Sequence, residues 1–382
     1  MTVKRILAVT ILVALLAGAA LAAGSDDKPP YAEAYEKRVG AEAILEVEKE
    51  YSLLQDEEAK AKVEAMASAI AAVSGRPDLT YDVRLLDTDM VNAFSLPGAT
   101  IYVTKGLLDE VQSDDELAGV LAHEIAHNCT YDALVQAERN KEYFTGSLAA
   151  TIAAILLGGS SDVVSTVLLA GEYVRQGVLG GYSIDMERRA DHHGALYLLR
   201  CGRYNPVGLV TFMERLAAKE RREPPTDLGV FQTHPLAVER VQLLTDYLIA
   251  NGVDINRRAT TKWDPPVAEE TKVDGQDAAT VRLWDEDIFL VLAPGPDAET
   301  PMARAQGIVQ RLTDLLAAGL QTYELGISLR DGNQVVTGRD KPIITVYAQD
   351  AQAQQLDAGQ IALNTKGALE RALFREHLNR LY

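Results

Sequence analysis

The spacing of apolar residues predicts that the first two thirds of the chain are mainly helical. Residues 32–74 place apolar side chains at intervals of three and four, which is the repeat of an amphipathic helix. Two stretches, 81–86 and 100–104, alternate apolar and polar residues and predict short strands. The stretch 253–275 is polar, contains a Trp-Asp-Pro-Pro sequence, and predicts a linker. We therefore expect residues 31–252 to form one mainly helical domain with a small sheet.

Beyond this linker the pattern changes to a mixture of strands and helices. The predicted elements are strands at 280–284, 288–293, 323–329 and 343–347, and helices at 302–318 and 351–381. A turn at Asp331-Gly332-Asn333 follows the third strand. We therefore expect a small α+β domain at residues 276–382, and an α+β fold class for the whole chain. This domain contains no metal-binding or nucleophile pattern, so a partner protein is one candidate ligand, with peptidoglycan and lipid as alternatives.

The N-terminus has the pattern of a secretory signal peptide at residues 1–24. Lys4 and Arg5 precede an apolar core, and small residues at 17–23 offer cleavage sites. The alternative is an uncleaved anchor, because residues 6–23 carry no charge. A signal peptide predicts a periplasmic or secreted protein.

Charge and cysteine content narrow the function classes further. The net charge of -18 argues against binding to nucleic acid. The chain has two cysteines, Cys129 and Cys201, and an exported compartment is oxidising enough for them to pair. Two buried free thiols are the equally acceptable alternative.

The strongest chemical pattern in the chain is His-Glu-Ile-Ala-His at residues 123–127. On a helix, His123 and His127 leave the same face and can bind one metal ion. Glu124 is then placed to act as general base on a water molecule at that ion. Ser113 and Glu116 predict a capping box at the start of the helix. Two core histidines that match by chance would not explain the cap, the spacing and the glutamate together.

A catalytic zinc ion bound by two histidines needs a third protein ligand. Glu187, Asp191 and Gly194 follow one another at spacings of four and three, so they share one face of a helix. Glu187 is the predicted ligand, and Asp191 is placed to accept the free ring N–H of a ligating histidine. Gly194 would let this helix approach the first one closely. His192 and His193 point away from that face, so we expect them at the surface or in a supporting position.

Three further stretches each have more than one interpretation. Asn92, Ala93 and Phe94 form either the edge strand to which an extended substrate adds or part of a plain hairpin. Residues 147–171 carry a single charge and form either a helical hairpin over the cleft or a shallow peripheral contact with a membrane. His234 precedes a helix, where it stabilises an oxyanion, binds zinc in a resting state, or only caps the helix.

Taken together, these residues resemble peptidase family M48, the CAAX prenyl protease and HtpX-like zinc metallopeptidases. The resemblance covers about residues 40–250. The segments that carry it are 91–98, 104–108, 116–127, 187–191, 233–235 and 239–240. The family often has an Arg-His pair after the second histidine, whereas Asn128 to Asp132 follow here. The long membrane spans of the integral members are replaced by short apolar segments, which favours the soluble exported branch.

The resemblance implies a gluzincin-like fold with one Zn²⁺ ion on His123, His127 and Glu187, and Glu124 as the base. It also implies that residues 92–94 are the strand that binds substrate. From the family and the signal peptide we expect a zinc metalloendopeptidase that cleaves unfolded or misassembled envelope proteins. The alternative is an envelope chaperone or assembly factor whose zinc site is shut or inactive.

Overall fold

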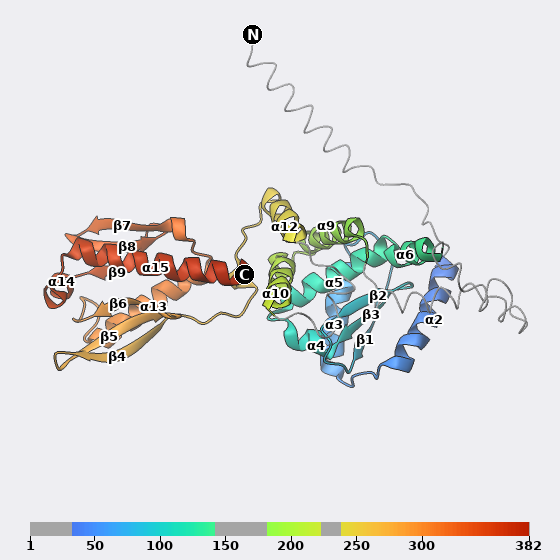
Figure 1. Cartoon of the computed structure of the whole chain (residues 1–382), viewed down its shortest axis with the longest axis horizontal. Helices are drawn as coiled ribbons and strands as arrows, with labels where there is room; N and C mark the ends of the chain where they lie inside the picture. Colours follow the sequence, from blue (N-terminus) through green and yellow to red (C-terminus); the bar gives the residue numbers. More distant parts are fainter. Residues whose placement is uncertain (1–32, 142–181, 223–237, 382) are drawn as a thin grey trace, which may run out of the picture.

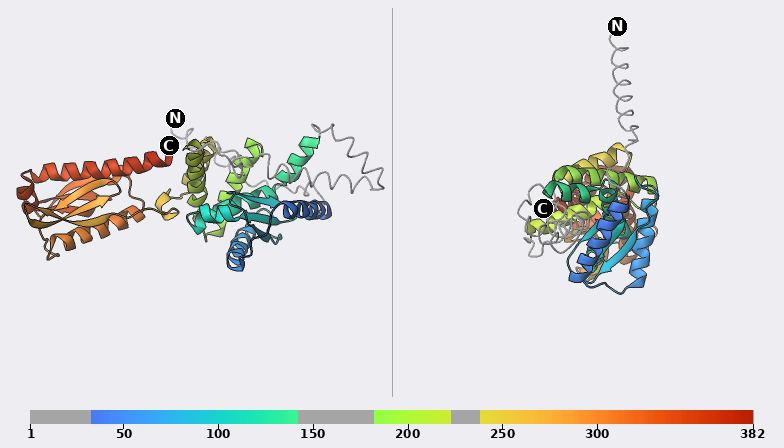
Figure 2. Two further views of the ribbon diagram at one scale, coloured as in Figure 1. Left: turned by 60° about the horizontal axis from the view of Figure 1, so that its bottom comes forward. Right: turned by 90° about the vertical axis from the view of Figure 1, so that its right-hand side faces the viewer.

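The computed structural model describes residues 33–141, 182–222 and 238–381. They form two bodies that lie end to end, a mainly helical N-terminal one and an α+β C-terminal one (Figures 1 and 2). The predicted signal peptide at 1–24, the apolar segment at 147–171 and His234 lie outside the described residues. No helix in the described part of the chain is both long and apolar enough to cross a membrane.

The N-terminal body is built from one small sheet and the helices around it. Its helices are α2 (Glu33–Glu50), α3 (Glu57–Ala71), α4 (Lys105–Glu110), α5 (Asp114–Cys129), α6 (Asp132–Lys141), α9 (Ile184–Cys201), α10 (Val207–Arg222) and α12 (Val238–Ala250). Its strands are β1 (Asp82–Leu86), β2 (Ala93–Leu96) and β3 (Thr100–Thr104). The strand order is β1-β3-β2, with β1 parallel and β2 antiparallel to β3. The helical pattern and the two strands predicted from the sequence are confirmed.

Helices cover both faces of this sheet. On one face, Ala43 and Val47 of α2 pack in a cluster with Phe94 and Tyr102. On the other face, Ile101 belongs to the main core, which α3 and α5 complete. Every residue of β2 and β3 is therefore buried. Strand β2 ends the sheet, and α5 packs against it.

The C-terminal body has two three-stranded antiparallel sheets around two long helices (Figure 1). Its strands are β4 (Val267–Val273), β5 (Gln276–Leu283), β6 (Glu286–Val291), β7 (Leu325–Arg330), β8 (Asn333–Gly338) and β9 (Lys341–Val346). Its helices are α13 (Pro301–Ala317), α14 (Ala348–Gln354) and α15 (Ala358–Leu381), with short 3₁₀ turns η2 (Arg257–Ala259) and η3 (Thr322–Glu324). Both sheets and both long helices contribute to one apolar core.

The sequence prediction differs from this body in two strands. Strand β4 occupies residues for which the sequence predicts a linker, at 253–275. The strand is exposed or half-buried along its whole length and has no apolar alternation, so its sequence does not have the pattern of a strand. Strand β8 was missed because Asn333, which begins it, also fits the preceding turn. The α+β class, with a mainly helical first body, is confirmed.

Candidate metal centre

Helix α5 carries the two histidines and is buried along almost all of its length. The Ser113 hydroxyl accepts the Glu116 N–H at 3.2 Å, as expected of an N-cap. The Glu116 carboxylate, however, accepts the N–H of Gln112 at 2.8 Å, one residue before the position that a capping box requires. At the other end, the Asn128 amide donates to the Leu96 carbonyl at 2.7 Å and ties the helix to β2.

Helix α9 brings the third candidate ligand against α5. A Cβ atom built on Gly194 would lie 3.1 Å from the His123 backbone nitrogen, which is tighter than an ordinary contact, so glycine favours this close approach of the two helices. The Ser183 hydroxyl caps α9 by accepting the Met186 N–H at 3.4 Å. Glu187, in the first turn of α9, is fully buried and faces the two histidines.

Three side chains converge in the arrangement that a tetrahedral metal requires. The Nε2 atoms of His123 and His127 are 3.0 Å apart. The Glu187 carboxylate oxygens lie 3.5 Å from His123 Nε2 and 3.4 Å from His127 Nε2. A tetrahedral zinc with bonds of about 2.1 Å separates its ligand atoms by roughly 3.3 Å, so this donor set fits a zinc ion. These residues form the one three-member candidate metal group among the described residues.

Each histidine also has a carboxylate behind it. Asp191 Oδ1 lies 3.0 Å from Nδ1 of His123, where the sequence predicted a supporting group. Asp132 Oδ2 lies 2.8 Å from Nδ1 of His127, a contact that the sequence pattern does not predict. Carboxylates in these positions hold the ring tautomer that leaves Nε2 free for a metal.

Chain geometry explains why Asp132 was not found. It follows the C-terminal end of α5, so the helical repeat that relates His123 to His127 does not extend to it. Tyr131 adopts a positive φ of 56° and turns the chain back towards the helix. The guanidinium of Arg189, on α9, pairs with Oδ1 of Asp132, the oxygen that does not contact His127.

Arg240 of α12 is the second residue whose contacts at the site the sequence pattern does not predict. Its guanidinium donates to both oxygens of Asp191, at 2.7 and 2.8 Å, and lies 2.6 Å from Glu187 Oε2. Arg240 is only 3% exposed, so its charge acts on both carboxylates in a medium of low dielectric constant. The contact holds one oxygen of Glu187 and leaves the other directed towards His127. Tyr182 stacks on the His127 ring, with the ring centroids 4.2 Å apart.

The electrostatics of the site favour a positive charge among the carboxylates. Burial alone lowers the pKa of His123, but hydrogen bonds to Asp191 and Glu187 outweigh burial and raise this pKa to about 10. Burial alone raises the pKa of Asp191, but hydrogen bonds from Arg240 and His123 outweigh it and lower this pKa below its usual value. The same carboxylates would stabilise a divalent cation.

Glu124 lies between the histidines and the edge strand. It is 2% exposed, and its Oε2 accepts the backbone N–H of Ser95 in β2 at 3.1 Å. The Ser95 hydroxyl donates to the Glu124 carbonyl at 2.9 Å, which fixes α5 against β2. Beside His123 and Glu124 is a small cavity of about 40 Å³, lined largely by apolar side chains that include Leu209 and Phe212 of α10.

Other side chains named in the sequence analysis do not join the three candidate ligands. His192 and His193 are half-buried and contact the rings of Tyr247 and Tyr197 respectively. Cys129 and Cys201 are free thiols and do not form a disulfide. His234 lies outside the described residues.

The fold and the site define the metallopeptidase class: two histidines and a glutamate converge on one point, with a buried carboxylate beside them. The model of peptidase family M48 matches residues 55–248, half of the chain, and the chain belongs to this family. A second model, described as a domain of unknown function, DUF8459, matches residues 280–376.

Three relatives show the extent of the similarity. Mitochondrial metalloendopeptidase OMA1 of Schizosaccharomyces pombe is 30% identical over 217 residues, which is 56% of this chain and 61% of the relative. Metalloprotease LoiP of Escherichia coli is 30% identical over 181 residues, 47% of this chain and 67% of the relative. Beta-barrel assembly-enhancing protease of Escherichia coli is 29% identical over 164 residues, 41% of this chain and 32% of the relative. The matches thus span between about a third and two thirds of these relatives.

Proposed function

We propose that this chain is a zinc metalloendopeptidase that cleaves unfolded or misassembled proteins of the cell envelope. The observation that carries the proposal is the convergence of one ligand atom each from His123, His127 and Glu187. These three atoms lie within 4.8 Å of one another, and Glu124 is beside them. Two nitrogen donors and one carboxylate oxygen form the ligand set of catalytic zinc sites that keep a position open. Membership of family M48 supports the peptide bond as the target.

In this proposal the side chains have separate roles. His123, His127 and Glu187 would hold the ion, while Asp191 and Asp132 fix the two rings. These three ligands would hold a zinc ion, which would supply polarisation of the substrate carbonyl and a lowered pKa of bound water. Glu124 takes the proton from the attacking water and delivers it to the leaving amine. Ser95 holds one oxygen of Glu124 by its backbone N–H, which orients the carboxylate beside the histidines.

An extended substrate would lie along β2, which ends the sheet next to Glu124. Residues 92–94 would then pair with the substrate backbone, as in other complexes where a peptide adds a strand to a sheet edge. The small cavity beside Glu124 would receive one apolar side chain of the substrate. His234 would stabilise the oxyanion.

We assign the peptidase domain to residues 31–252 and the C-terminal α+β domain to about residues 276–382. The signal-peptide pattern at 1–24 supports a periplasmic or secreted location, and hence envelope proteins as substrates. Two of the relatives are named as bacterial proteases, and one of these as assembly-enhancing for β-barrels.

Metal analysis and a casein cleavage assay on wild type and Glu124→Gln test the proposal. We expect both proteins to bind one zinc ion per chain, because Glu124 is not a ligand. We expect only the wild type to cleave, with a loss of more than about a thousandfold in the variant. Glu187→Gln should lose zinc as well as cleavage. Zinc binding without turnover in the wild type would contradict a peptidase and favour the envelope chaperone or assembly factor.

A further inference from the structure

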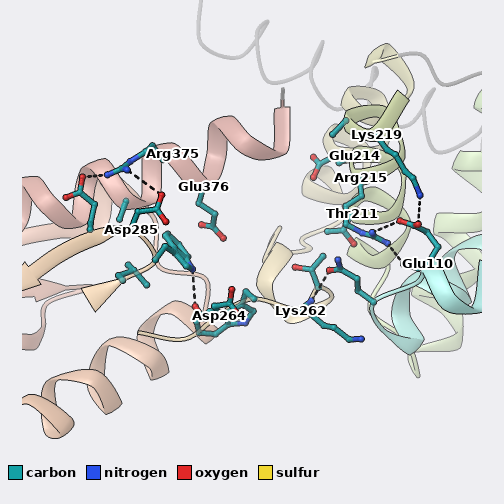
Figure 3. A pocket seen from close by; sticks show the side chains of 18 residues that line it. Glu110, Thr211, Glu214, Arg215, Lys219, Lys262, Asp264, Asp285, Arg375 and Glu376 are labelled. Carbon is teal, nitrogen blue, oxygen red and sulfur yellow. Dashed lines mark hydrogen bonds and ion pairs between the residues drawn. The ribbon is translucent and has the colours of Figure 1, made fainter. Parts of the chain in front are cut away.

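A cavity of about 580 Å³ lies between the N-terminal body and the C-terminal body (Figure 3). Its first wall is formed by α10 and the end of α4, and its second wall by the β5–β6 turn and α15. In Figure 3, Arg215 and Lys219 project from the first wall, and Arg375 and Asp285 lie on the second. The volume falls in the range of sites that bind ligands, roughly 300–1,000 Å³.

The residues between the two bodies hold these walls in place. Arg257 forms a bidentate pair with Glu214 of α10, at 2.6 and 2.8 Å. The next residue, Arg258, pairs with Glu376 of α15 and donates to the Leu320 carbonyl at 3.2 Å. Two consecutive arginines therefore bind opposite walls. The cavity is formed by fixed contacts, so a ligand would enter a largely preformed site.

Both tryptophans of the chain, Trp263 and Trp284, line this cavity. Trp284 has a positive φ of 53° in the two-residue turn that joins Leu283 to Glu286. Glycine, asparagine and aspartate are usual in that conformation, and a bulky residue there costs about 1–2 kcal/mol. Its Nε1 donates to the Asp264 carbonyl at 3.0 Å. The strained turn holds the ring where it both packs against the C-terminal core and lines the cavity, which fits a functional site.

Charged groups of both signs line the cavity. Its cations Arg215, Lys219 and Arg375 already pair with carboxylates, and Lys262 is exposed, so the carboxylates beside the tryptophans indicate the kind of ligand. Among the described residues, the Asp264 carboxylate makes no ion pair or hydrogen bond, and it is exposed. The Asp285 side chain is 86% exposed and lies 3.8 Å from Arg375. Carboxylates next to tryptophan rings provide both charge and a cation–π surface for lysine or arginine side chains. The negative net charge of the chain would also attract a basic ligand.

We propose that this interdomain cavity binds a lysine- or arginine-bearing segment of the polypeptide client, at a distance from the metal centre. This inference rests on the proposed peptidase function and names a second contact for the same substrate. Helix α10 separates the two sites. Its residues Leu209 and Phe212 face the small cavity beside Glu124, whereas Glu214 and Lys219 face the interdomain cavity. A client bound at both sites would have to pass around this helix.

Substrate length therefore separates the two sites experimentally. A path halfway around a helix of about 12 Å diameter is roughly 19 Å, whereas a pentapeptide spans at most about 18 Å. An internally quenched pentapeptide would engage the metal centre alone. Reduced, carboxamidomethylated lysozyme, a long unfolded polypeptide with a basic net charge, would engage both sites.

The test uses the full chain with Trp284→Asn or Asp264→Lys. Asparagine removes the ring and suits the positive φ, and the Asp264 carboxylate makes no ion pair or hydrogen bond within the described residues, so both variants should fold. We expect roughly tenfold weaker binding of unfolded lysozyme in a Glu124→Gln background, and a similar rise in KM with wild-type Glu124. The kcat for this substrate and cleavage of the pentapeptide should be unchanged. Tyr323→Asn removes an aromatic side chain that is 86% exposed outside this cavity, and it should change neither measurement.

Unchanged lysozyme binding in Asp264→Lys and Trp284→Asn would overturn the inference. Equal losses of cleavage of lysozyme and of the pentapeptide would also overturn the inference, because they would show a general effect on the enzyme. Binding of soluble peptidoglycan fragments in place of lysozyme would overturn the assignment of the ligand class. If the wild type cleaves neither substrate, the peptidase proposal fails, while the lysozyme-binding comparison still tests the cavity.

Discussion

Asp132 Oδ2 lies 2.8 Å from Nδ1 of His127, although this aspartate follows the end of the helix that carries the histidine. Asp191 makes the equivalent contact with His123 at 3.0 Å. Each carboxylate is in turn held by an arginine, Arg189 for Asp132 and Arg240 for Asp191. Both candidate metal ligands on α5 are therefore oriented by charged groups from α6, α9 and α12, so the site depends on the packing of four helices.

Asp132→Asn should weaken zinc binding about 10- to 100-fold, with the fold retained. The amide keeps the size of the side chain but loses the charge that makes His127 a stronger ligand. The measurement is competition for zinc with a chromophoric chelator. Asp185→Asn is the control, because that side chain is 93% exposed on the same helix as Glu187. Equal affinities of the two variants would contradict the role assigned to Asp132.

Arg240→Met should destabilise the metal-free protein by about 3–5 kcal/mol, because two buried carboxylates lose the guanidinium that pairs with both of them. Zinc should recover part of this loss, since its charge replaces that of the guanidinium. Chemical denaturation with chelator and with zinc measures both effects. Arg188→Met is the matched control: its pair with Glu239 joins the same two helices, but the side chains are 39% and 63% exposed. That variant should lose no more than about 1 kcal/mol.

The sequence predicted those parts of the site that depend on regular helical repeats. His123 and His127 are related by one helical turn, and the spacing from Glu187 to Asp191 and Gly194 places all three against α5. Asp132 was not predictable in this way, because its position depends on the backbone turn at Tyr131.

Residues distant in the sequence were harder to place for a different reason. Arg240 reaches the site only because α12 packs on α9. Neither the spacing of Arg240 nor its neighbours in the sequence predict that packing. Similarly, β4 has polar side chains because it is exposed, so the alternation used to find strands is absent. The cavity between the two bodies depends on how the bodies are joined, which no local pattern specifies.

Gly194→Ala should destabilise the protein by about 1–3 kcal/mol and weaken zinc binding. The added methyl group would lie 3.1 Å from the His123 backbone nitrogen and 3.2 Å from the Ala122 carbonyl carbon, so α9 must move away from α5. Thermal unfolding and the chelator competition assay measure the two effects. Gly307→Ala in α13 is the control, because its nearest neighbour is the flexible end of Arg311 at 3.4 Å. We expect that substitution to stabilise its helix by roughly 0.5–1 kcal/mol, so loss of stability in Gly194→Ala alone would locate the effect at the helix contact.

Zinc binding near pH 7 should release at least one proton from the protein. Burial disfavours the charged form of His123, but the contacts with Asp191 and Glu187 raise its pKa to about 10, so the metal-free imidazole is protonated at neutral pH. A metal binds only the neutral ring, so the apparent affinity should rise about tenfold per pH unit for each proton released, below pH 10. Calorimetric titration in buffers of different ionisation enthalpy counts these protons. Asp191→Asn should release fewer, because it removes the carboxylate that hydrogen-bonds to His123, and equal proton release from the two proteins would show that this carboxylate does not raise the pKa.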